Sequence, residues 1–411
     1  MGLDMQTRRA LRQQIHSRYV KATKTEKSRI LDEFIELTGF TRSYAARALR
    51  QGVGSTVSSG GRRRGSGRKR VYGEAVLEPL RQIWAILDSP CGKRLVAALP
   101  AMVTKLEQHG EQRLSSQTRS LLVSMSAATI DRVLAPDRKR MALKGRSGTK
   151  PGALLRTRIP IRTFADWDAT CPGFVEVDLV AHEGGDPSGD FCQTLNLTDV
   201  VSGWTESRAV RNKARRWVFE ALQTLRAQLP FRLLGLDSDN GGEFINNHLF
   251  AYCETEQITF TRSRPHRKND NCYVEQKNYT TVRYAVGYFR YDTPTELERL
   301  NALYDRLRLM NNYFQPQMKL INKERDGAKV RRRYDAPQTP CQRLLASPKI
   351  PHSVKKRLRK EYAALNPAQL RREILDIQQE LRQLAACKDS EENPYYEYSS
   401  PRGNELRSST F

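Results

Sequence analysis

The sequence lacks the features that would place it in a membrane or in a secretory pathway. No run of about 18 apolar residues occurs, which excludes a membrane-spanning helix. The N-terminal residues carry charges with no apolar segment behind them, so no secretory signal is expected. The seven cysteines include no CxxC pair, which argues against a disulfide framework and a zinc cluster and favours a reducing, cytoplasmic compartment.

Acidic residues are much less frequent than basic residues in this chain. Its 411 residues contain 70 Lys and Arg against 45 Asp and Glu, a net charge of +25. The net charge is +18 over residues 1–150, −1 over residues 151–292 and +8 over residues 293–411. Because each neutralised phosphate releases counterions, two basic flanks indicate a nucleic-acid partner rather than a merely solubilising surface. The length and the 38% hydrophobic share predict two or three globular domains.

Residues 1–52 have the pattern of a helix-turn-helix DNA-binding domain. Apolar residues at helical spacing run from Ile30 to Leu37, with Thr25 expected as the N-cap and Gly39 as the C-cap. A short second helix, residues 42–50, follows the turn. An ordinary helical hairpin is the alternative. The start of a recognition helix contacts base edges, so we expect DNA contacts from Arg42, Ser43, Tyr44 and Arg47.

Residues 53–72 form a linker that is rich in glycine, serine and arginine, and six of the ten residues 61–70 are cationic. We expect this arm to follow phosphates or to enter a minor groove; the alternative is a solvated linker without contacts. Its expected DNA-binding residues are Arg62, Arg63, Arg64, Arg68, Lys69 and Arg70. Residues 73–150 repeat the pattern of helix, turn and helix, with Ser126 as an N-cap, and predict a second helical DNA-binding domain. Residues 151–172 are a connector.

The middle of the chain, residues 173–292, predicts a mixed α/β domain. Strands are expected at residues 174–180, 191–200, 204–210, 231–236 and 258–261, and helices at residues 214–229, 244–257 and 271–288. This order is typical of one mixed sheet covered by helices.

Residues 293–387 form a basic and helical C-terminal region. It opens with a helix at residues 295–312 and contains a basic stretch from Lys329 to Tyr334. Apolar residues near heptad spacing, from Leu370 to Leu384, predict a helix at residues 367–387. This helix packs either within the chain or against a second copy. Residues 388–411 are expected to be a disordered tail.

Three carboxylates of the middle domain do not suit a simple core. Asp178, like Glu176, interrupts a strand of buried type, where a carboxylate is costly unless it is paired or binds a metal. Asp239 follows the fourth strand at the turn Asn240-Gly241, and Glu275 lies near the start of a helix. Converging carboxylates favour Mg²⁺ or Mn²⁺, and two such ions can activate a water or a hydroxyl at phosphorus.

Together these residues resemble the acidic triad of the retroviral-integrase-type DDE transposases of bacterial insertion sequences. The segment Ser238-Asp239-Asn240-Gly241-Gly242-Glu243-Phe244 is similar to the second-Asp motif of that family, and 35 residues separate Asp239 from Glu275. Residues 264–278 resemble the family's approach to its Glu. The resemblance implies an RNase H-like core with a mixed five-stranded sheet. Asp178 would lie on its first strand, Asp239 after its fourth and Glu275 on a following helix.

The resemblance further implies a DNA transposase/integrase. Such a protein binds the terminal inverted repeats of its element, hydrolyses a phosphodiester to free a 3′-hydroxyl, and joins that hydroxyl to target DNA. Asp178, Asp239 and Glu275 would be both the catalytic residues and the ligands of two Mg²⁺ or Mn²⁺ ions. The expected partners are double-stranded DNA and at least one further copy of the chain, in the cytoplasm of a bacterium at its nucleoid. A domesticated DNA-binding regulator and an RNase H-like nuclease without joining activity are the alternatives.

A basic loop precedes Glu275, and we expect it to hold DNA phosphates near the scissile bond. Its DNA-binding residues are Arg264, His266, Arg267 and Lys268, and Lys277 is expected to reach DNA from the following helix. A general base is the alternative role for His266.

Two further aspartates compete with the triad. Asp237 is a partner of Asp239 or, alternatively, the true ligand, and Asp199 is expected to be structural or to support the site. The sequence departs from the retroviral proteins in lacking their N-terminal His/Cys zinc module, and the helix-turn-helix takes its place.

Overall fold

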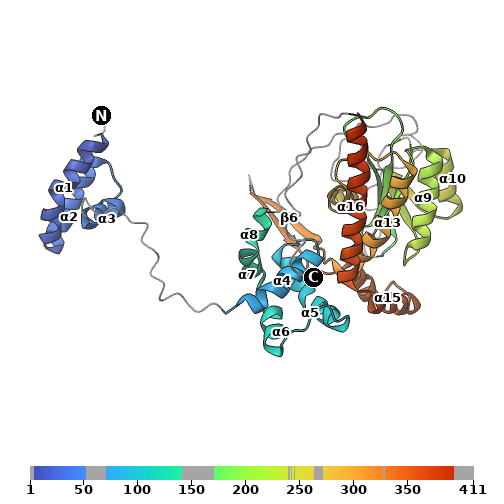
Figure 1. The fold of residues 1–411 in the computed structure, drawn as a ribbon, viewed down its shortest axis with the longest axis horizontal. Helices are drawn as coiled ribbons and strands as arrows, with labels where there is room; N and C mark the ends of the chain where they lie inside the picture. The colour runs from blue at the N-terminus through green and yellow to red at the C-terminus, as the bar shows by residue number, and fades with distance from the viewer. Residues whose placement is uncertain are drawn as a thin grey trace. The chain divides into compact units, whose positions relative to one another are not determined.

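The structure is a computed structural model that describes residues 4–51, 71–140, 171–238, 241, 243–244, 246–262, 272–326 and 329–392. The chain divides into two compact units after Val71 (Figure 1), and each unit is described by itself. Within the described ranges, no helix has the length and apolar character needed to cross a membrane. The six cysteines whose side chains the structure describes are free thiols.

The N-terminal unit consists of three helices, α1 (Met5–Lys21), α2 (Lys24–Thr38) and α3 (Arg42–Gln51). Each helix contributes to a small core through Tyr19, Phe34 and Leu49. Gly39 ends α2 in the left-handed conformation, with a φ of 68°, as predicted. The N-cap of α2 is Thr23 and not Thr25, because Glu26 lies three residues after Thr23 and completes a capping box with it.

The second unit contains the predicted mixed sheet of five strands. They are β1 (Phe174–Ala181), β2 (Gln193–Asp199), β3 (Thr205–Val210), β4 (Gly235–Ser238) and β5 (Thr259–Arg262). The spatial order is β3-β2-β1-β4-β5; β2 is antiparallel to β1 and β3, and β4 is parallel to β1 and β5. This sheet confirms the RNase H-like α/β fold. β4 begins four residues later than predicted, because its partner β1 begins at Phe174, which pairs with Gly235.

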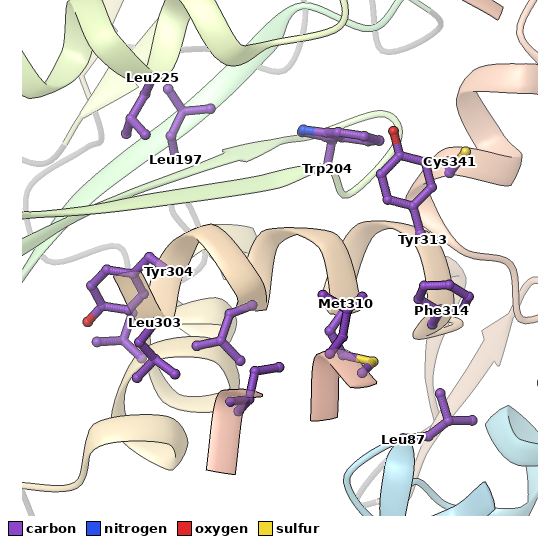
Figure 2. Packing of buried hydrophobic residues seen from close by; sticks show 14 of the residues in the cluster. Leu87, Leu197, Trp204, Leu225, Leu303, Tyr304, Met310, Tyr313, Phe314 and Cys341 are labelled. Carbon is purple, nitrogen blue, oxygen red and sulfur yellow. The ribbon is translucent and has the colours of Figure 1, made fainter. Parts of the chain in front are cut away.

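Helices lie on both faces of the sheet (Figure 1). One face is covered by α9 (Arg215–Gln228) and α10 (Asn247–Thr255), and Leu225 of α9 lies near Leu197 of β2 (Figure 2). On the other face, α11 (Cys272–Lys277) contacts β1 and β2 and continues into η1 (Asn278–Arg283) and α12 (Tyr284–Val286). The predicted helix at residues 271–288 is therefore interrupted, because η1 is a π-helical turn.

A second long helical segment packs along the edge strand β3. It comprises α13 (Pro294–Leu309) and the π-helical η2 (Met310–Phe314). Figure 2 shows Tyr304, Met310 and Phe314 along this segment, and Tyr313 facing Trp204 of the β2–β3 turn. The rings of Tyr313 and Trp204 meet edge to face, with their centres 5.6 Å apart. This segment therefore joins the sheet to the helices that lie beyond it.

The C-terminal helix α16 (Pro367–Glu392) packs against α13 within the chain. Its apolar residues Leu370, Ile374 and Leu381 are buried there, and Arg306 of α13 pairs with Glu373 at 2.5 Å. The structure thus favours the intramolecular alternative for this helix. The helix continues to Glu392, past its predicted end, and the rest of the predicted disordered tail lies outside the described residues.

The helices that precede the sheet share one hydrophobic core with it. They are α4 (Glu74–Ile86), α5 (Gly92–Gln108), α6 (Ser116–Val123) and α7 (Ala127–Val133); the short α8 (Ala135–Arg140) follows them. They contact the C-terminal α14 (Pro340–Ala346), α15 (His352–Ala364) and α16 region through bonds such as that from Lys105 to the carbonyl of Ala363, at 2.7 Å. Arg371 pairs with Asp88, also at 2.7 Å. Residues 72–140 are thus packed on the C-terminal helices, although the sequence analysis divided these regions.

Two asparagine side chains cover the outer edge of β3. Asn312 accepts a hydrogen bond from the backbone N–H of Thr205 at 2.9 Å and donates one to its carbonyl at 2.8 Å. Asn301 makes the same pair of bonds with Ala209, at 2.9 and 3.2 Å. An open strand edge presents unpaired backbone groups, and these two amides satisfy those of Thr205 and Ala209 in place of a neighbouring strand.

A hairpin of two antiparallel strands, β6 (Leu320–Asp326) and β7 (Lys329–Tyr334), follows η2. The sequence of this region indicates only a basic stretch. Charged residues are depleted in strands, so a segment dominated by arginine does not have the alternating apolar pattern by which strands are predicted.

The buried imidazole of His182 lies at the end of β1. Its Nε2 lies 2.7 Å from the hydroxyl of Thr194, which lies 2.8 Å from the hydroxyl of Tyr304. Its Nδ1 has no hydrogen-bond partner, and the ring packs against Tyr291. Burial lowers the pKa of His182 from 6.5 to about 3, so the folded protein holds this ring neutral.

The free energy of unfolding is therefore expected to fall as the pH drops below 6.5. In the unfolded chain His182 takes up a proton near pH 6.5, whereas in the folded chain it does so only near pH 3. The contribution of His182 to the free energy of unfolding is therefore complete above pH 6.5 and is lost as the pH falls from 6.5 to 3. The slope approaches about 1.4 kcal/mol per pH unit. Thermal unfolding over this pH range should show that the free energy of unfolding depends less on pH in His182→Gln than in the wild type. His352→Gln replaces an exposed histidine, and its free energy of unfolding should change with pH as in the wild type. Equal slopes in all three proteins would contradict a buried neutral ring.

Candidate active site

Strand β1 places two carboxylates on one face of the sheet. Glu176 and Asp178 are two residues apart, so their side chains point to the same side. The register places Asn196 of β2 beside Asp178, and Ser207 of β3 beside Asn196. On the other side of β1, Asp237 of β4 lies beside Glu176. The centre of this face is therefore polar, whereas the opposite face carries the buried residues Val175, Val177, Leu195, Leu197 and Leu236.

Glu176 fixes the start of helix α11. Its carboxylate is fully buried, and its Oε2 accepts hydrogen bonds from the backbone N–H groups of Tyr273 at 2.9 Å and Val274 at 3.0 Å. The first N–H groups of a helix have no partner within the helix, and a carboxylate also interacts favourably with the positive end of the helix dipole. Glu176 therefore anchors to β1 the helix that carries Glu275.

Asn278, the first residue of η1, connects the same helical segment to Asp178. Its Nδ2 donates to Oδ2 of Asp178 at 2.6 Å, and its Oδ1 accepts from Nδ2 of Asn196 at 2.9 Å. Asn196 accepts in turn from the hydroxyl of Ser207 at 3.0 Å. The other oxygen of Asp178 accepts from the backbone N–H of Leu179 at 2.8 Å. The carboxylate of Asp178 is thus oriented by hydrogen bonds to both oxygens.

Glu275 lies on α11, three residues before Asn278. Residues at this spacing lie on the same side of a helix, so the contact between Asn278 and Asp178 draws this side of α11 toward β1. The side chain of Glu275 is exposed, and that of Asp178 is partly exposed. The π-helical turn starts directly after α11, and such turns are frequent at functional sites.

Asp239, the third predicted ligand, lies outside the described residues. The last pair in the register of β1 with β4 is Val177 with Ser238, and Asp178 and Asp239 are the residues that follow these two in the sequence. The described structure therefore contains two of the three predicted ligands, and the place of Asp239 stays a prediction.

Asp237 is fully buried on β4, where its Oδ1 accepts a hydrogen bond from the hydroxyl of Thr261 at 2.5 Å. This bond links β4 to β5 on the same face of the sheet as Glu176. A buried carboxylate that bridges two strands is a poorer candidate for a metal ligand than the partly exposed Asp178, so the geometry favours a supporting role for Asp237.

Asp199 lies at the end of β2 and pairs with Val175, which places it on the face opposite to Asp178. Its oxygens accept hydrogen bonds from the backbone of Gly173 at 2.8 Å and from the backbone and hydroxyl of Ser202 at 2.6 Å. Burial raises the pKa of Asp199, and these hydrogen bonds oppose the shift. Asp199 therefore shapes the β2–β3 turn, and these contacts favour the structural role over a role in supporting the site.

The predicted DNA contacts of the N-terminal unit lie on α3. Ser43, Tyr44 and Arg47 are exposed, and the guanidinium of Arg47 lies 5.5 Å from the centre of the Tyr44 ring. Arg42 is also exposed, but its guanidinium pairs with Asp32 of α2. The predicted contacts of the linker and of the basic loop lie outside the described residues: Arg62, Arg63, Arg64, Arg68, Lys69, Arg70, Arg264, His266, Arg267 and Lys268.

Lys277 is only partly exposed, at the end of α11. Burial lowers the pKa of its ammonium group, and the nearby guanidinium of Arg94 on α5 lowers it further. Arg94 itself donates a hydrogen bond to the carbonyl of Pro316. The partial burial of Lys277 limits how much of its side chain a phosphate could contact, and its expected contact with DNA stays a prediction.

The described part of the chain contains no group of three His, Cys, Asp or Glu side chains that could hold a metal ion. The two predicted ligands that it does contain, Asp178 and Glu275, supply hard carboxylate oxygens of the kind that Mg²⁺ and Mn²⁺ prefer. The donor type therefore fits a divalent cation, and Asp239 would complete the set.

Three supporting residues were not identified from the sequence. Glu176, Asn196 and Asn278 hold Asp178 and α11 in place, and each is buried or partly buried. The position of Glu176 beside the site could have been predicted, because two acidic residues at alternate positions of an apolar strand must share one face. The contact of Asn278 depends on the packing of η1 against β1, for which the sequence holds no local signal.

Comparison with known proteins gives a relative that matches most of this chain and a set of structural likenesses. No known family model matches the sequence. The "Uncharacterized protein y4rM" of Sinorhizobium fredii (strain NBRC 101917 / NGR234) is 40% identical over 343 residues, which cover 83% of this chain and 96% of that protein.

Among solved structures, the catalytic core domain of BIV integrase has 17% identity and a TM-score of 0.28, and the match covers 41% of this chain and 91% of that chain. The HTLV-2 integrase catalytic core domain in complex with magnesium has 13% identity and the same TM-score, over 36% of this chain and 92% of that chain. At these TM-scores the likenesses carry no weight by themselves, and the fold is assigned from the strand order of the sheet.

Proposed function

The chain belongs to the same protein family as y4rM of Sinorhizobium fredii, and we propose that it is a metal-dependent DNA transposase. The observation that carries the proposal is the attachment of α11 to β1 at two points. Glu176 holds the first turn of the helix, and Asn278 binds Asp178 just after its last turn. Between these two attachments lies Glu275, exposed to solvent.

The residues present would hold two Mg²⁺ or Mn²⁺ ions through Asp178, Asp239 and Glu275. When bound, such ions activate the attacking oxygen and stabilise the leaving oxygen at phosphorus. The chain itself would orient the donors: Asn278 and the backbone of Leu179 fix the two oxygens of Asp178. Fixed donors lower the cost of reorganisation in the transition state.

The proposed reaction has two steps, and in the second step one phosphodiester bond forms as another one breaks. Water first attacks a phosphorus at the element's end, and the 3′-oxygen leaves as a hydroxyl. That hydroxyl then attacks a phosphorus of target DNA, one phosphodiester forms, and the displaced 3′-oxygen of the target strand leaves with the proton. No oxidant or reductant is needed.

The N-terminal unit would recognise the ends of the element. Ser43, Tyr44 and Arg47 are exposed near the start of α3, a position from which recognition helices contact base edges. The linker arginines and the basic loop before Glu275 would add contacts to phosphates, as the sequence predicts.

The test is an assay of the full chain on labelled duplexes taken from the DNA that flanks its gene. The wild type is expected to cleave and join these duplexes only when Mg²⁺ or Mn²⁺ is added, and EDTA should abolish both reactions while leaving DNA binding intact. Cleavage that persists in EDTA would refute the metal-dependent mechanism. Cleavage without joining would instead indicate a nuclease, and binding without either reaction would indicate a regulator.

A further inference from the structure

The β6–β7 hairpin is an exposed feature of the second unit to which the proposed chemistry gives no role (orange in Figure 1). Three consecutive residues of β7, Arg331, Arg332 and Arg333, are exposed. They are accompanied by two large exposed side chains, Tyr334 at 47% and Ile321 at 61% of their full surface. A hairpin of two strands is marginally stable in water by itself, so a binding partner would stabilise it.

Positive charge lies on both faces of the hairpin. Successive side chains of a strand point to opposite faces, so Arg331 and Arg333 lie on one face and Arg332 and Tyr334 on the other. On the first face Glu324 of β6 stands opposite Arg331 and offsets part of the charge. The major groove of DNA accepts a two-stranded ribbon, and its two walls are lined by phosphates. A narrow ribbon with arginines on both faces is complementary to that groove.

The base of the hairpin is anchored beside the candidate active site. Lys319, which precedes β6, donates from Nζ to the carbonyl of Val201 in the β2–β3 turn at 2.7 Å, and this ammonium lies 5.9 Å from the ring centre of Tyr273 on α11. Asp335, which follows β7, accepts from the backbone N–H of Lys319 and from Arg343, both at 2.6 Å. The hairpin therefore starts next to the helix that carries Glu275.

We propose that the β6–β7 hairpin is a DNA-binding ribbon that holds the duplex whose phosphodiester is presented to the candidate active site. The choice of DNA as its partner rests on the proposed function. A second copy of the chain fits the hairpin less well, because pairing β7 with β7 would bring arginines opposite arginines, and like charges in cross-strand positions are destabilising.

The test compares two charge-matched variants of the full chain. One carries Arg331→Ala, Arg332→Ala and Arg333→Ala; the control carries Arg357→Ala, Arg359→Ala and Lys360→Ala at exposed positions of α15. Binding to a duplex of unrelated sequence is measured in EDTA over a series of salt concentrations. The hairpin variant should bind about 10-fold or more weakly, and its plot of log affinity against log salt should be shallower by about 2. The control should stay close to the wild type.

Each result bears on the inference. Equal losses in the two variants would show a general effect of net charge and would overturn the hairpin's role, as would wild-type binding by the hairpin variant. Because the substituted side chains are exposed, both variants should have the melting temperature of the wild type. If the hairpin variant has a lower melting temperature, a triple Arg→Gln variant, which keeps long side chains, must show the same shallower slope of log affinity against log salt. Since the assay needs no cleavage, weak binding by the hairpin variant together with an inactive wild type would refute only the transposase proposal.

Discussion

An Asp178→Asn variant is expected to lose strand cleavage and joining while it still binds DNA. The substitution keeps the size of the side chain but removes the charge that a divalent cation requires. The expected loss in the cleavage rate is about 1,000-fold, equivalent to roughly 4 kcal/mol of transition-state stabilisation. The rate is measured on labelled element ends in Mg²⁺, and binding is measured on the same duplexes in EDTA.

Glu275→Gln provides a second test of the same carboxylate site, and the neighbouring Gln276 provides its control. Both residues are exposed on α11, so neither substitution should change the melting temperature by much. Glu275→Gln should lose cleavage as Asp178→Asn does, whereas Gln276→Ala should cleave within about twofold of the wild type. If Asp178→Asn retained a tenth or more of the wild-type rate, the metal role of this carboxylate would be rejected.

Replacement of Glu176 by alanine is expected to have the largest effect on stability. The substitution leaves the N–H groups of Tyr273 and Val274 without their carboxylate partner at a buried site. Hydrogen bonds to a charged group are worth about 1.5–3 kcal/mol, and unpaired buried donors add a cost, so a loss of roughly 3 kcal/mol is expected. Because α11 would no longer be held to β1, cleavage should fall as well. Denaturant unfolding and the cleavage assay measure the two effects.

The pattern across variants distinguishes anchoring from metal binding. Glu176→Gln keeps one acceptor oxygen and should recover part of the stability lost in Glu176→Ala. Glu275→Gln should differ from Glu176→Ala in its stability: it should unfold with the free energy of the wild type although it does not cleave. A Glu176→Ala protein as stable as the wild type would contradict the anchoring role of this residue.

The mixed sheet could be predicted because its strands and helices leave a strong local pattern. The order of the five strands and their helices along the chain follows from apolar runs broken by turn residues, and the structure contains them in that order. The predicted ends of strands and helices were less accurate where a contact with another residue determines the end. β4 starts where Phe174 offers a pairing partner, and α10 starts where the side chain of Asn246 accepts from the backbone of Leu249.

The contacts that hold Asp178 and α11 in place could not be predicted from the sequence. Asp178 and Glu275 were identified from residue type and from resemblance to a family. The contacts of Glu176 with α11 and of Asn278 with Asp178 join residues about 100 positions apart, and they exist only after α11 packs on β1. Likewise, the effect of Arg94 on the ammonium group of Lys277 joins residues far apart in the sequence, and the expected contact of Lys277 with DNA stays a prediction.

The two amides that close β3 restrict how copies of this chain can assemble. Since Asn301 and Asn312 already occupy the backbone groups of Ala209 and Thr205, two copies could merge their sheets through β3 across a two-fold axis only by displacing these amides. In a complex that brings two DNA ends together, the catalytic cores would stay separate along this side. Synapsis would then depend on helices, on the hairpin, or on the DNA itself to bridge one copy to the next.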